Sequence, residues 1–278
     1  GLTMPKVLSG DEVAQYHDQG FLAPLDLLGE AAAATLFGRF EALETEVGGD
    51  VSQRFRIKAH LPFPWLCDLI SQPRLLDVIE DIIGPTILCW GATFFIKKPG
   101  DERFISWHTD SFFYGTRPAE TLTAWVSFNA SDTESGCIQF IPGSHKTVAV
   151  HELIPDPNNM SSNGQTVVDT DENLAVKAIL KPGQFSLHHE SVVHGSSPNL
   201  SDHARIGFSI HYCPPHVREK RFDGATAMLL RGEDALGDWL PDPRPARDFD
   251  PACIEMMDNT LERFRESTNN KIAAGGKS

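Results

Sequence analysis

The residue pattern with the clearest chemical meaning is a histidine two positions before an acidic residue. It occurs twice, at His108 with Asp110 and at His188 with Glu190. On a β-strand, side chains two positions apart point to the same face, so each pair can present an imidazole and a carboxylate together. Two histidines and one carboxylate form a facial triad, which holds Fe(II) and leaves coordination positions open. Each pair therefore offers two of the three ligands.

Position along the chain separates the two pairs. His108 and Asp110 follow a Pro-Gly turn at the opening of a β-rich region, so a later strand can supply the third ligand. His188 and Glu190 come shortly before His194, where one strand and its turn would have to hold the whole set. The first pair, joined by a histidine from a later strand, is the stronger candidate.

A second cluster places His194 at the end of one predicted strand and Arg205 at the start of the next. The Ser, Pro and Asn residues between them predict a turn, so an antiparallel return would bring Arg205 beside His194. A guanidinium matches a carboxylate through two parallel hydrogen bonds, which suits a carboxylate-bearing co-substrate. Considered alone, an arginine at the start of a strand usually faces solvent, and a single histidine usually has a structural role. Their combination and order favour a functional site.

The elements that must position these residues are short β-strands. From Thr86 onward, β-type runs alternate with turn residues such as Pro99-Gly100, and no helical pattern intervenes. Many short strands joined by turns predict an antiparallel barrel or sandwich. The strand that begins at Arg205 alternates polar and apolar side chains, so one of its faces can line a polar pocket.

Helical patterns flank the β-rich region. Ser9 with Glu12 forms a capping-box pattern, and the first helix is expected to end at Gly20. Apolar spacing predicts further helices over 30–47 and 73–83 and a last helix that begins at Pro251.

Composition excludes several classes of protein. The chain has 278 residues, of which 41% are hydrophobic, and a formal net charge of −14. Nucleic acids and anionic membranes require a basic surface, so neither is expected as a partner. The five cysteines are scattered and include no C-x-x-C pair, which favours free thiols in a reducing compartment. No signal peptide or membrane-spanning run is visible, so a cytoplasmic location is expected.

The motifs, taken in order, resemble the phytanoyl-CoA dioxygenase family of Fe(II)- and 2-oxoglutarate-dependent oxygenases. The resemblance covers most of the chain, and a Pro-Gly-Ser-His-Lys segment followed by a His-Gly-Ser segment is specific. The residues that carry it are Tyr16, Gly20-Phe21, Trp107-His108-Thr109-Asp110, Ala124-Trp125, Gly136-Cys137, Ile141-Pro142-Gly143-Ser144-His145-Lys146, His194-Gly195-Ser196, Asn199, Arg205 and Leu230-Arg231-Gly232.

This resemblance implies a metal centre and a co-substrate site. His108, Asp110 and His194 would bind Fe(II). Arg205 would hold the distal carboxylate of 2-oxoglutarate, helped by the hydroxyl group of Ser196. The implied reaction uses O2, releases succinate and CO2, and hydroxylates an unactivated C–H bond of a small-molecule metabolite.

Two further residues bear on this reaction. Trp125 would pack against 2-oxoglutarate, and the strand alternation places it on one face with Thr123 and Ser127, although an ordinary core aromatic is the alternative. Halogenases of related families carry a small residue in place of the carboxylate ligand. The presence of Asp110 therefore favours hydroxylation over halogenation.

The expected fold is mainly β with flanking helices, built on a double-stranded β-helix (jelly-roll, cupin-like) core. One oxygenase domain is expected over 1–278. Within it, 1–85 would be a helical N-terminal support, 86–215 the jelly-roll core and 216–278 a C-terminal extension with a helix.

The prime substrate is expected beside the iron, near Phe112, Tyr114 and Arg117. The polar stretch over 155–173 is long for a loop in a compact domain, which makes it a candidate lid. No cluster of basic residues suits a CoA nucleotide, so a small polar or anionic metabolite is preferred to an acyl-CoA. Two other functions stay open: a non-catalytic cupin-like small-molecule binding protein, and a jelly-roll metalloenzyme that does not use 2-oxoglutarate.

Overall fold

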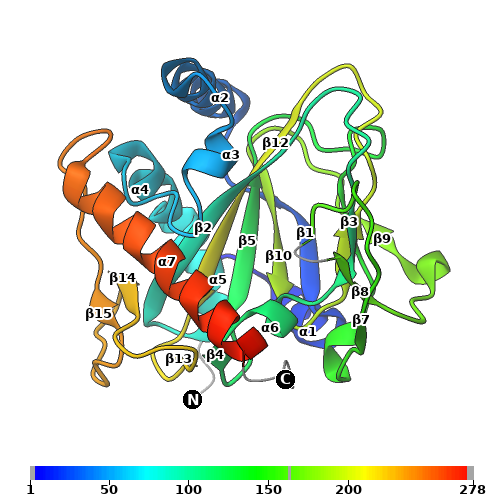
Figure 1. Ribbon diagram of the computed structural model, residues 1–278. Helices are drawn as coiled ribbons and strands as arrows, with labels where there is room; N and C mark the ends of the chain where they lie inside the picture. Colours follow the sequence, from blue (N-terminus) through cyan, green and yellow to red (C-terminus); the bar gives the residue numbers. More distant parts are fainter. Residues whose placement is uncertain (1–3, 162–163, 274–278) are drawn as a thin grey trace.

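Two antiparallel β-sheets form the centre of the computed structural model, which describes residues 4–161 and 164–273 (Figure 1). The larger sheet has the order β1 (Phe21–Asp26), β10 (Gln184–His189), β5 (Leu122–Ser127), β12 (Arg205–Cys213), β2 (Ile87–Lys97), β14 (Thr226–Arg231) and β15 (Leu240–Pro241), with only the last pair parallel. The smaller sheet has the order β3 (Ile105–His108), β11 (His194–Ser196), β6 (Ile138–Phe140) and β9 (Val176–Lys177). The expected two-sheet β fold with flanking helices is confirmed.

Two short strand pairs, seven α-helices and the 3-10 helices η1 (Ser144–Lys146) and η3 (Glu172–Leu174) also lie in the described part of the chain. The strand pairs are β4 (Thr116–Arg117) with β13 (Arg218–Glu219) and β7 (His151–Leu153) with β8 (Gln165–Val167). The helices are α1 (Gly10–Gln19), α2 (Glu30–Val47), α3 (Val51–Arg54), α4 (Pro64–Ile70), α5 (Pro73–Ile83), α6 (Asp110–Phe113) and α7 (Pro251–Ala273). Within residues 4–161 and 164–273, every helix is too short or too polar to cross a bilayer.

The helix ends agree with the sequence signals. Ser9 and Glu12 exchange the two hydrogen bonds of a capping box at the start of α1. Gly20 and Gly48 end α1 and α2 in the left-handed conformation, with φ angles of 85° and 66°. Glycine adopts this conformation without a steric penalty, so each helix stops where the pattern predicts.

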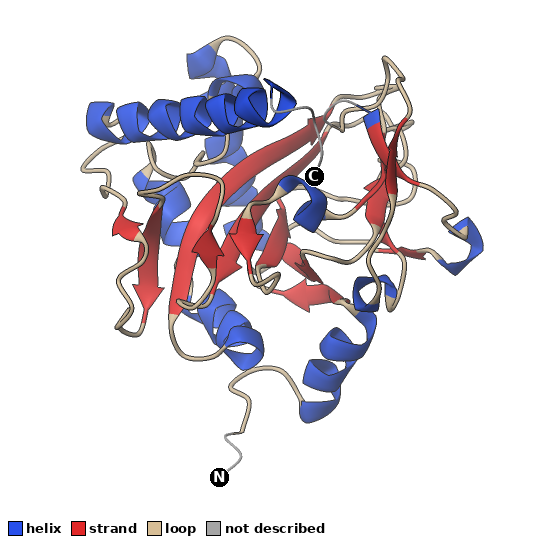
Figure 2. Cartoon of the chain, turned by 60° about the horizontal axis from the view of Figure 1, so that its bottom comes forward, coloured by secondary structure: helices blue, strands red, loops and turns tan. Residues whose placement is uncertain are grey.

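The main apolar core lies between the larger sheet and the N-terminal helices. Phe40 of α2 packs against Phe94 of β2, and Phe94 packs against Phe208 of β12, with ring centroids 5.4 and 4.6 Å apart. Each fully buried phenylalanine contributes roughly 1.5–3 kcal/mol of transfer free energy. Figure 2 shows the long strands of the larger sheet at the centre of the molecule, with the smaller sheet to their right. The face of the larger sheet that is turned away from the N-terminal helices is therefore free to carry polar groups.

The N-terminal third contains a strand that its helical pattern did not predict. Phe21–Asp26 forms the edge strand β1, in which Phe21 pairs with His188 of β10. The Phe21 ring stacks on Phe140 of the smaller sheet at 4.6 Å. β1 is an edge strand that pairs with a segment distant in sequence, so the local spacing of apolar residues does little to predict it.

The polar stretch over 155–173 is built partly into secondary structure. Strand β8 pairs with β7, and Ser106 Oγ of β3 donates a hydrogen bond to the Gln165 carbonyl at 3.0 Å. Asn159 Nδ2 donates in turn to Ser106 Oγ at 2.9 Å. The described parts of this stretch, 155–161 and 164–173, thus contact the strand that carries His108, residues 162–163 lie outside the described chain, and a role as a lid stays a prediction.

A buried ion pair connects the segment after α3 to the segment that leads into α7. Lys58 Nζ lies 2.9 Å from Asp242 Oδ2, and the two side chains are 2% and 0% exposed. The same ammonium donates to the carbonyl oxygens of Trp90 in β2 and Thr226 in β14, at 3.1 and 2.9 Å. Lys58 therefore holds one edge of the larger sheet and the approach to the last helix together.

We expect Lys58→Met to lower the free energy of unfolding by about 3–5 kcal/mol, because it leaves the buried Asp242 carboxylate unpaired. Urea denaturation measures this change. Arg54→Ala is the control, since the Arg54–Asp258 pair is 44% and 52% exposed and should contribute less than about 1 kcal/mol. Equal losses in the two variants would contradict a special role for the buried pair.

Candidate active site

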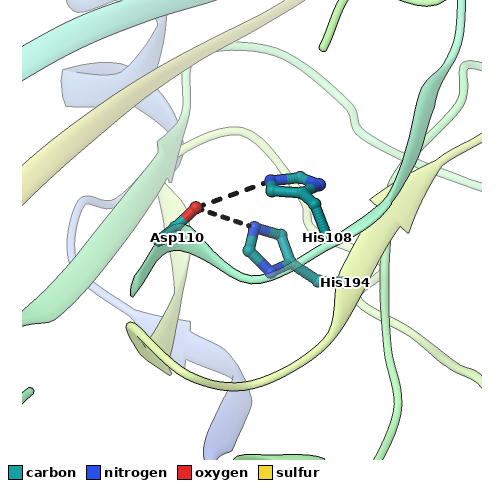
Figure 3. Close-up of side chains that lie close together, drawn as sticks. All are labelled: His108, Asp110 and His194. Atoms are coloured by element: carbon teal, nitrogen blue, oxygen red, sulfur yellow. Dashed lines mark ion pairs between the residues drawn. The ribbon is translucent and has the colours of Figure 1, made fainter. Parts of the chain in front are cut away.

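Three side chains converge at the edge of the smaller sheet. They are His108 at the end of β3, Asp110 at the start of α6 and His194 at the start of β11. One potential ligand atom from each lies within 4.8 Å of the others. Asp110 Oδ1 is 3.5 Å from His108 Nε2 and 3.4 Å from His194 Nε2, and Figure 3 shows both imidazoles turned toward the carboxylate.

Strand register brings the two histidines together. His194 is the cross-strand partner of His108 in the β11–β3 pair, and the ring centroids are 4.3 Å apart. Asp110 arrives by a different route from the one predicted, because β3 ends at His108 and Asp110 is the first residue of α6. The same-face rule for strands therefore does not apply to it. The turn through Thr109 into α6 directs the carboxylate toward the histidines.

Backbone carbonyls define the tautomers of both imidazoles. His108 Nδ1 lies 2.8 Å from the Ser106 oxygen, and His194 Nδ1 lies 2.9 Å from the Val192 oxygen. A carbonyl oxygen only accepts hydrogen bonds, so each Nδ1 carries the proton and each Nε2 presents a lone pair. Burial lowers the pKa of His194 to about 3, which keeps this ring neutral near pH 7.

A metal cation fits this donor set. Two Nε2 lone pairs and the Asp110 carboxylate face one another, and no proton lies between them in these tautomers. Three convergent acceptors repel one another unless a cation joins them, and this ligand set is typical of non-haem Fe(II).

His188 makes a contact that the sequence pattern did not predict. Its Nε2 lies 3.0 Å from Asp110 Oδ2, and its side chain is 3% exposed. This bond occupies the oxygen that faces away from His108 and His194, so Oδ1 is left for a metal. Glu190, the second member of the same motif, accepts a hydrogen bond from the Thr121 amide at 3.1 Å. The H-x-E motif identified His188 in the sequence, but only the tertiary structure shows that it contacts Asp110.

A buried guanidinium lies in the same pocket. Arg205 is 1% exposed, and its Cζ atom is 5.2 Å from the centre of the Trp125 ring. One terminal nitrogen donates to the Gly136 carbonyl, whereas Nε has no hydrogen-bond partner among the described residues. A buried donor without a partner is costly, so this end of the pocket suits an acceptor-bearing ligand.

The route by which Arg205 reaches the site differs from the prediction. It does not pair with His194, because β12 pairs with β2 and β5 in the larger sheet whereas β11 belongs to the smaller sheet. The chain crosses between the sheets over 197–204. Arg205 and His194 nevertheless line one pocket, since the inner faces of both sheets border it.

The lack of a side chain at Gly207 leaves room for the Trp125 ring to lie across β12. A Cβ atom added to Gly207 would come within 1.8 Å of the Trp125 ring, so only glycine fits at this position. Arg205, Ser209 and His211 occupy the same face of β12 and line the pocket, as the polar alternation predicted. His211 Nδ1 lies 3.1 Å from the Tyr114 hydroxyl group, which adds a polar wall.

The pocket has a volume of about 630 Å3 and takes lining from both sheets and from α7. Of the expected substrate residues, Tyr114 lines it. Phe112 and Arg117 are absent from the lining among the described residues. Phe112 is 39% exposed and stacks on His151, and the Arg117 side chain donates to the carbonyls of Tyr114 and Thr116. Trp125 and Ser196 both line the pocket, as expected.

Comparisons with known proteins converge on one family. The family model described as phytanoyl-CoA dioxygenase (PhyH) matches residues 16–207. Phytanoyl-CoA dioxygenase domain-containing protein 1 of Danio rerio is 31% identical over 158 residues, which are 55% of this chain and 54% of that protein. The peroxisomal phytanoyl-CoA dioxygenase of Bos taurus is 26% identical over 167 residues, which are 58% and 50% of the two chains. The chain thus spans about half the length of these curated relatives.

Solved structures extend the similarity over more of the chain. The non-heme monooxygenase ThoJ, in its apo form, has a TM-score of 0.82 and 27% identity, and it covers 95% of this chain and 100% of its own. CytC3 with Fe(II) and alpha-ketoglutarate has a TM-score of 0.67 and 22% identity, with coverages of 87% and 96%. At that identity, the second comparison shows the shared fold alone.

We expect His188→Phe to weaken the binding of a divalent metal by about 10–100-fold, because Asp110 loses the bond that orients its carboxylate. Calorimetric titration with Mn(II) or Ni(II) measures the affinity. His188→Gln, whose amide can still donate, should retain part of it. His17→Gln is the control, since His17 is exposed and lies outside the pocket lining. An unchanged affinity in His188→Phe would contradict this role.

Proposed function

Because the chain belongs to the phytanoyl-CoA dioxygenase (PhyH) family, we propose that it is an Fe(II)- and 2-oxoglutarate-dependent dioxygenase that hydroxylates an unactivated C–H bond of a small-molecule metabolite. One observation carries this proposal. Two histidines and an aspartate converge in the same pocket as a buried arginine whose Nε has no partner among the described residues.

His108, Asp110 and His194 would hold the iron through the two Nε2 atoms and the carboxylate. Bound Fe(II) would supply the activation of O2 that is coupled to decarboxylation of 2-oxoglutarate to succinate and CO2. The protein contributes ligand geometry: backbone carbonyls orient both imidazoles, and His188 orients the carboxylate. Retention of Asp110 favours hydroxylation over halogenation.

Arg205 and Ser196 would bind the distal carboxylate of 2-oxoglutarate, with Trp125 packed beside it. The buried position of Arg205 supports this assignment, because a guanidinium removed from water needs an anionic partner. The two alternative functions explain the site less well. A metalloenzyme that does not use 2-oxoglutarate leaves the guanidinium without a role, and a non-catalytic binding protein leaves the two histidines and the aspartate without one.

The prime substrate would occupy the part of the pocket that α7 borders. Arg221 ties this helix to the site, since it donates to Ser267 Oγ at 2.7 Å and to the carbonyl of Phe113, in α6, at 3.2 Å. Leu261, Phe264, Arg265, Thr268 and Asn269 of α7 line the pocket. All of them lie beyond residue 207, where the family match ends. We therefore assign substrate selection largely to this C-terminal part of the chain.

The charge of the lining supports a small anionic or polar metabolite over an acyl-CoA. Asp110 is the only acidic side chain among the described lining residues, whereas Arg56, Arg205, Arg221 and Arg265 are basic. A cavity of about 630 Å3 is in the usual range for a single small ligand. A cytoplasmic location stays a prediction, and the Bos taurus relative is described as peroxisomal.

Anaerobic addition of Fe(II) and 2-oxoglutarate should produce a weak visible charge-transfer band. The band should vanish in His108→Ala, which lacks a metal ligand, and weaken in Arg205→Ala, which lacks the partner of the distal carboxylate. His17→Gln should retain it in full. No band in the parent protein would rule out the proposed function.

Succinate formation over a panel of metabolites should identify substrates that carry a carboxylate or phosphate group, with methyl esters of the same compounds turning over less. Arg265→Gln should raise the KM of such a substrate by about tenfold, the effect of losing one charged hydrogen bond. Arg39→Gln, an exposed residue of α2 outside the lining, should leave it unchanged. Equal turnover of acids and esters would contradict anion selection.

A further inference from the structure

A second buried cation lies next to Arg205. Lys97 ends β2 and is the cross-strand partner of Arg205 in β12. The two residues are 0% and 1% exposed, and both are among the largest fully buried side chains. Two adjacent positive charges in the interior of a protein whose formal net charge is −14 call for an explanation.

No internal counter-ion compensates these cations within the described part of the chain. The ion pairs found there include neither Lys97 nor Arg205. The nearby carboxylate of Asp101 is already committed, since it accepts hydrogen bonds from the Arg103 guanidinium at 2.6 to 3.1 Å. Burial, and after it the charge of Arg205, lowers the pKa of Lys97 to about 6. An arriving anion would therefore stabilise the ammonium form.

The contacts of Lys97 determine how a neighbouring hydroxyl group can act. Its Nζ donates to Ser196 Oγ at 2.7 Å and to the carbonyl oxygen of Ser197. With an anion bound nearby, Lys97 is an ammonium group, which only donates, so Ser196 Oγ is then the acceptor in this bond and its own proton must point elsewhere. Ser196 lines the pocket, and its hydroxyl donates to no other described residue. The proton is thus available to a ligand.

We propose that Lys97 is a positioning residue for the co-substrate: it orients the Ser196 hydroxyl toward the pocket and adds to Arg205 the second positive charge that selects a dicarboxylate. This inference rests on the proposed use of 2-oxoglutarate. The distal carboxylate then meets a guanidinium donor and a hydroxyl donor, with an ammonium group behind the hydroxyl. A 2-oxo acid that lacks the distal carboxylate gains nothing from this arrangement.

The test compares two 2-oxo acids of equal chain length. Anaerobic titration of the Fe(II)-loaded protein with 2-oxoglutarate and with 2-oxopentanoate gives both affinities from the charge-transfer band. We expect Lys97→Met to weaken 2-oxoglutarate binding about tenfold or more, as for a lost charged hydrogen bond, and to change 2-oxopentanoate binding less than about threefold. Lys97→Arg should restore much of the discrimination because it keeps the charge.

Two further measurements separate positioning from a purely structural role. Mn(II) affinity should be unchanged in Lys97→Met, because Lys97 touches none of the candidate metal ligands. The loss of 2-oxoglutarate affinity that Lys97→Met causes should be smaller in a Ser196→Ala background than in the parent protein, because part of the effect passes through this hydroxyl. If Lys97→Met does not fold, Lys97→Gln replaces it as the variant without the charge and is compared with Lys97→Arg, which keeps the charge.

The outcomes distinguish this inference from the proposed function. Equal losses for both acids, or no loss for either, would overturn the role of Lys97 while the parent band still supports 2-oxoglutarate use. A parent protein without a band would overturn both.

Discussion

The register between β11 and β3 is the constraint on which the candidate site depends. It sets His194 opposite His108, and the turn into α6 then brings Asp110 to the same point. Side chains alternate along a strand, so a slip by one residue would turn His194 to the other face and dissolve the cluster. The neighbouring β6 fixes this register from its other side, where Phe140 pairs with His194. The triad is therefore a property of the smaller sheet as a whole.

The two faces of the larger sheet border different environments: the apolar core on one side and the pocket on the other. In β12, Phe208 and its apolar neighbours pack toward the N-terminal helices, whereas Arg205 and His211 face the pocket. The apolar face stabilises the fold. The polar face carries buried groups, such as Arg205, that lower the stability of the protein when no ligand is bound. Gly207 lets Trp125 cover part of that polar face. Such a division agrees with a rigid scaffold whose strained or uncompensated groups gather at the functional site.

Buried charge is handled in two different ways. Lys58 has a carboxylate partner and two carbonyl acceptors, so its charge is compensated within the fold. Lys97 and Arg205 have carbonyl and hydroxyl acceptors, and among the described residues they have no carboxylate partner. Desolvated cations of this kind are costly unless a ligand supplies the anion. The lack of a carboxylate partner for Lys97 and Arg205 agrees with an anion-binding function at one end of the pocket. The internal ion pair of Lys58 agrees with a structural function at an edge of the larger sheet.

Local patterns in the chain were sufficient for the helix ends and for the alternation of polar and apolar side chains in β12. Both depend on residues close together in sequence, where capping and strand periodicity act directly. The three candidate ligands were expected from the order of the motifs and the family resemblance, and strand register and the turn into α6 bring them together. Other features depend on pairing between distant strands. They include the bond from His188 to Asp110, the pairing of Lys97 with Arg205 and the placement of α7 over the pocket. Sheet order and register arise from packing of the whole chain, so no local period encodes them.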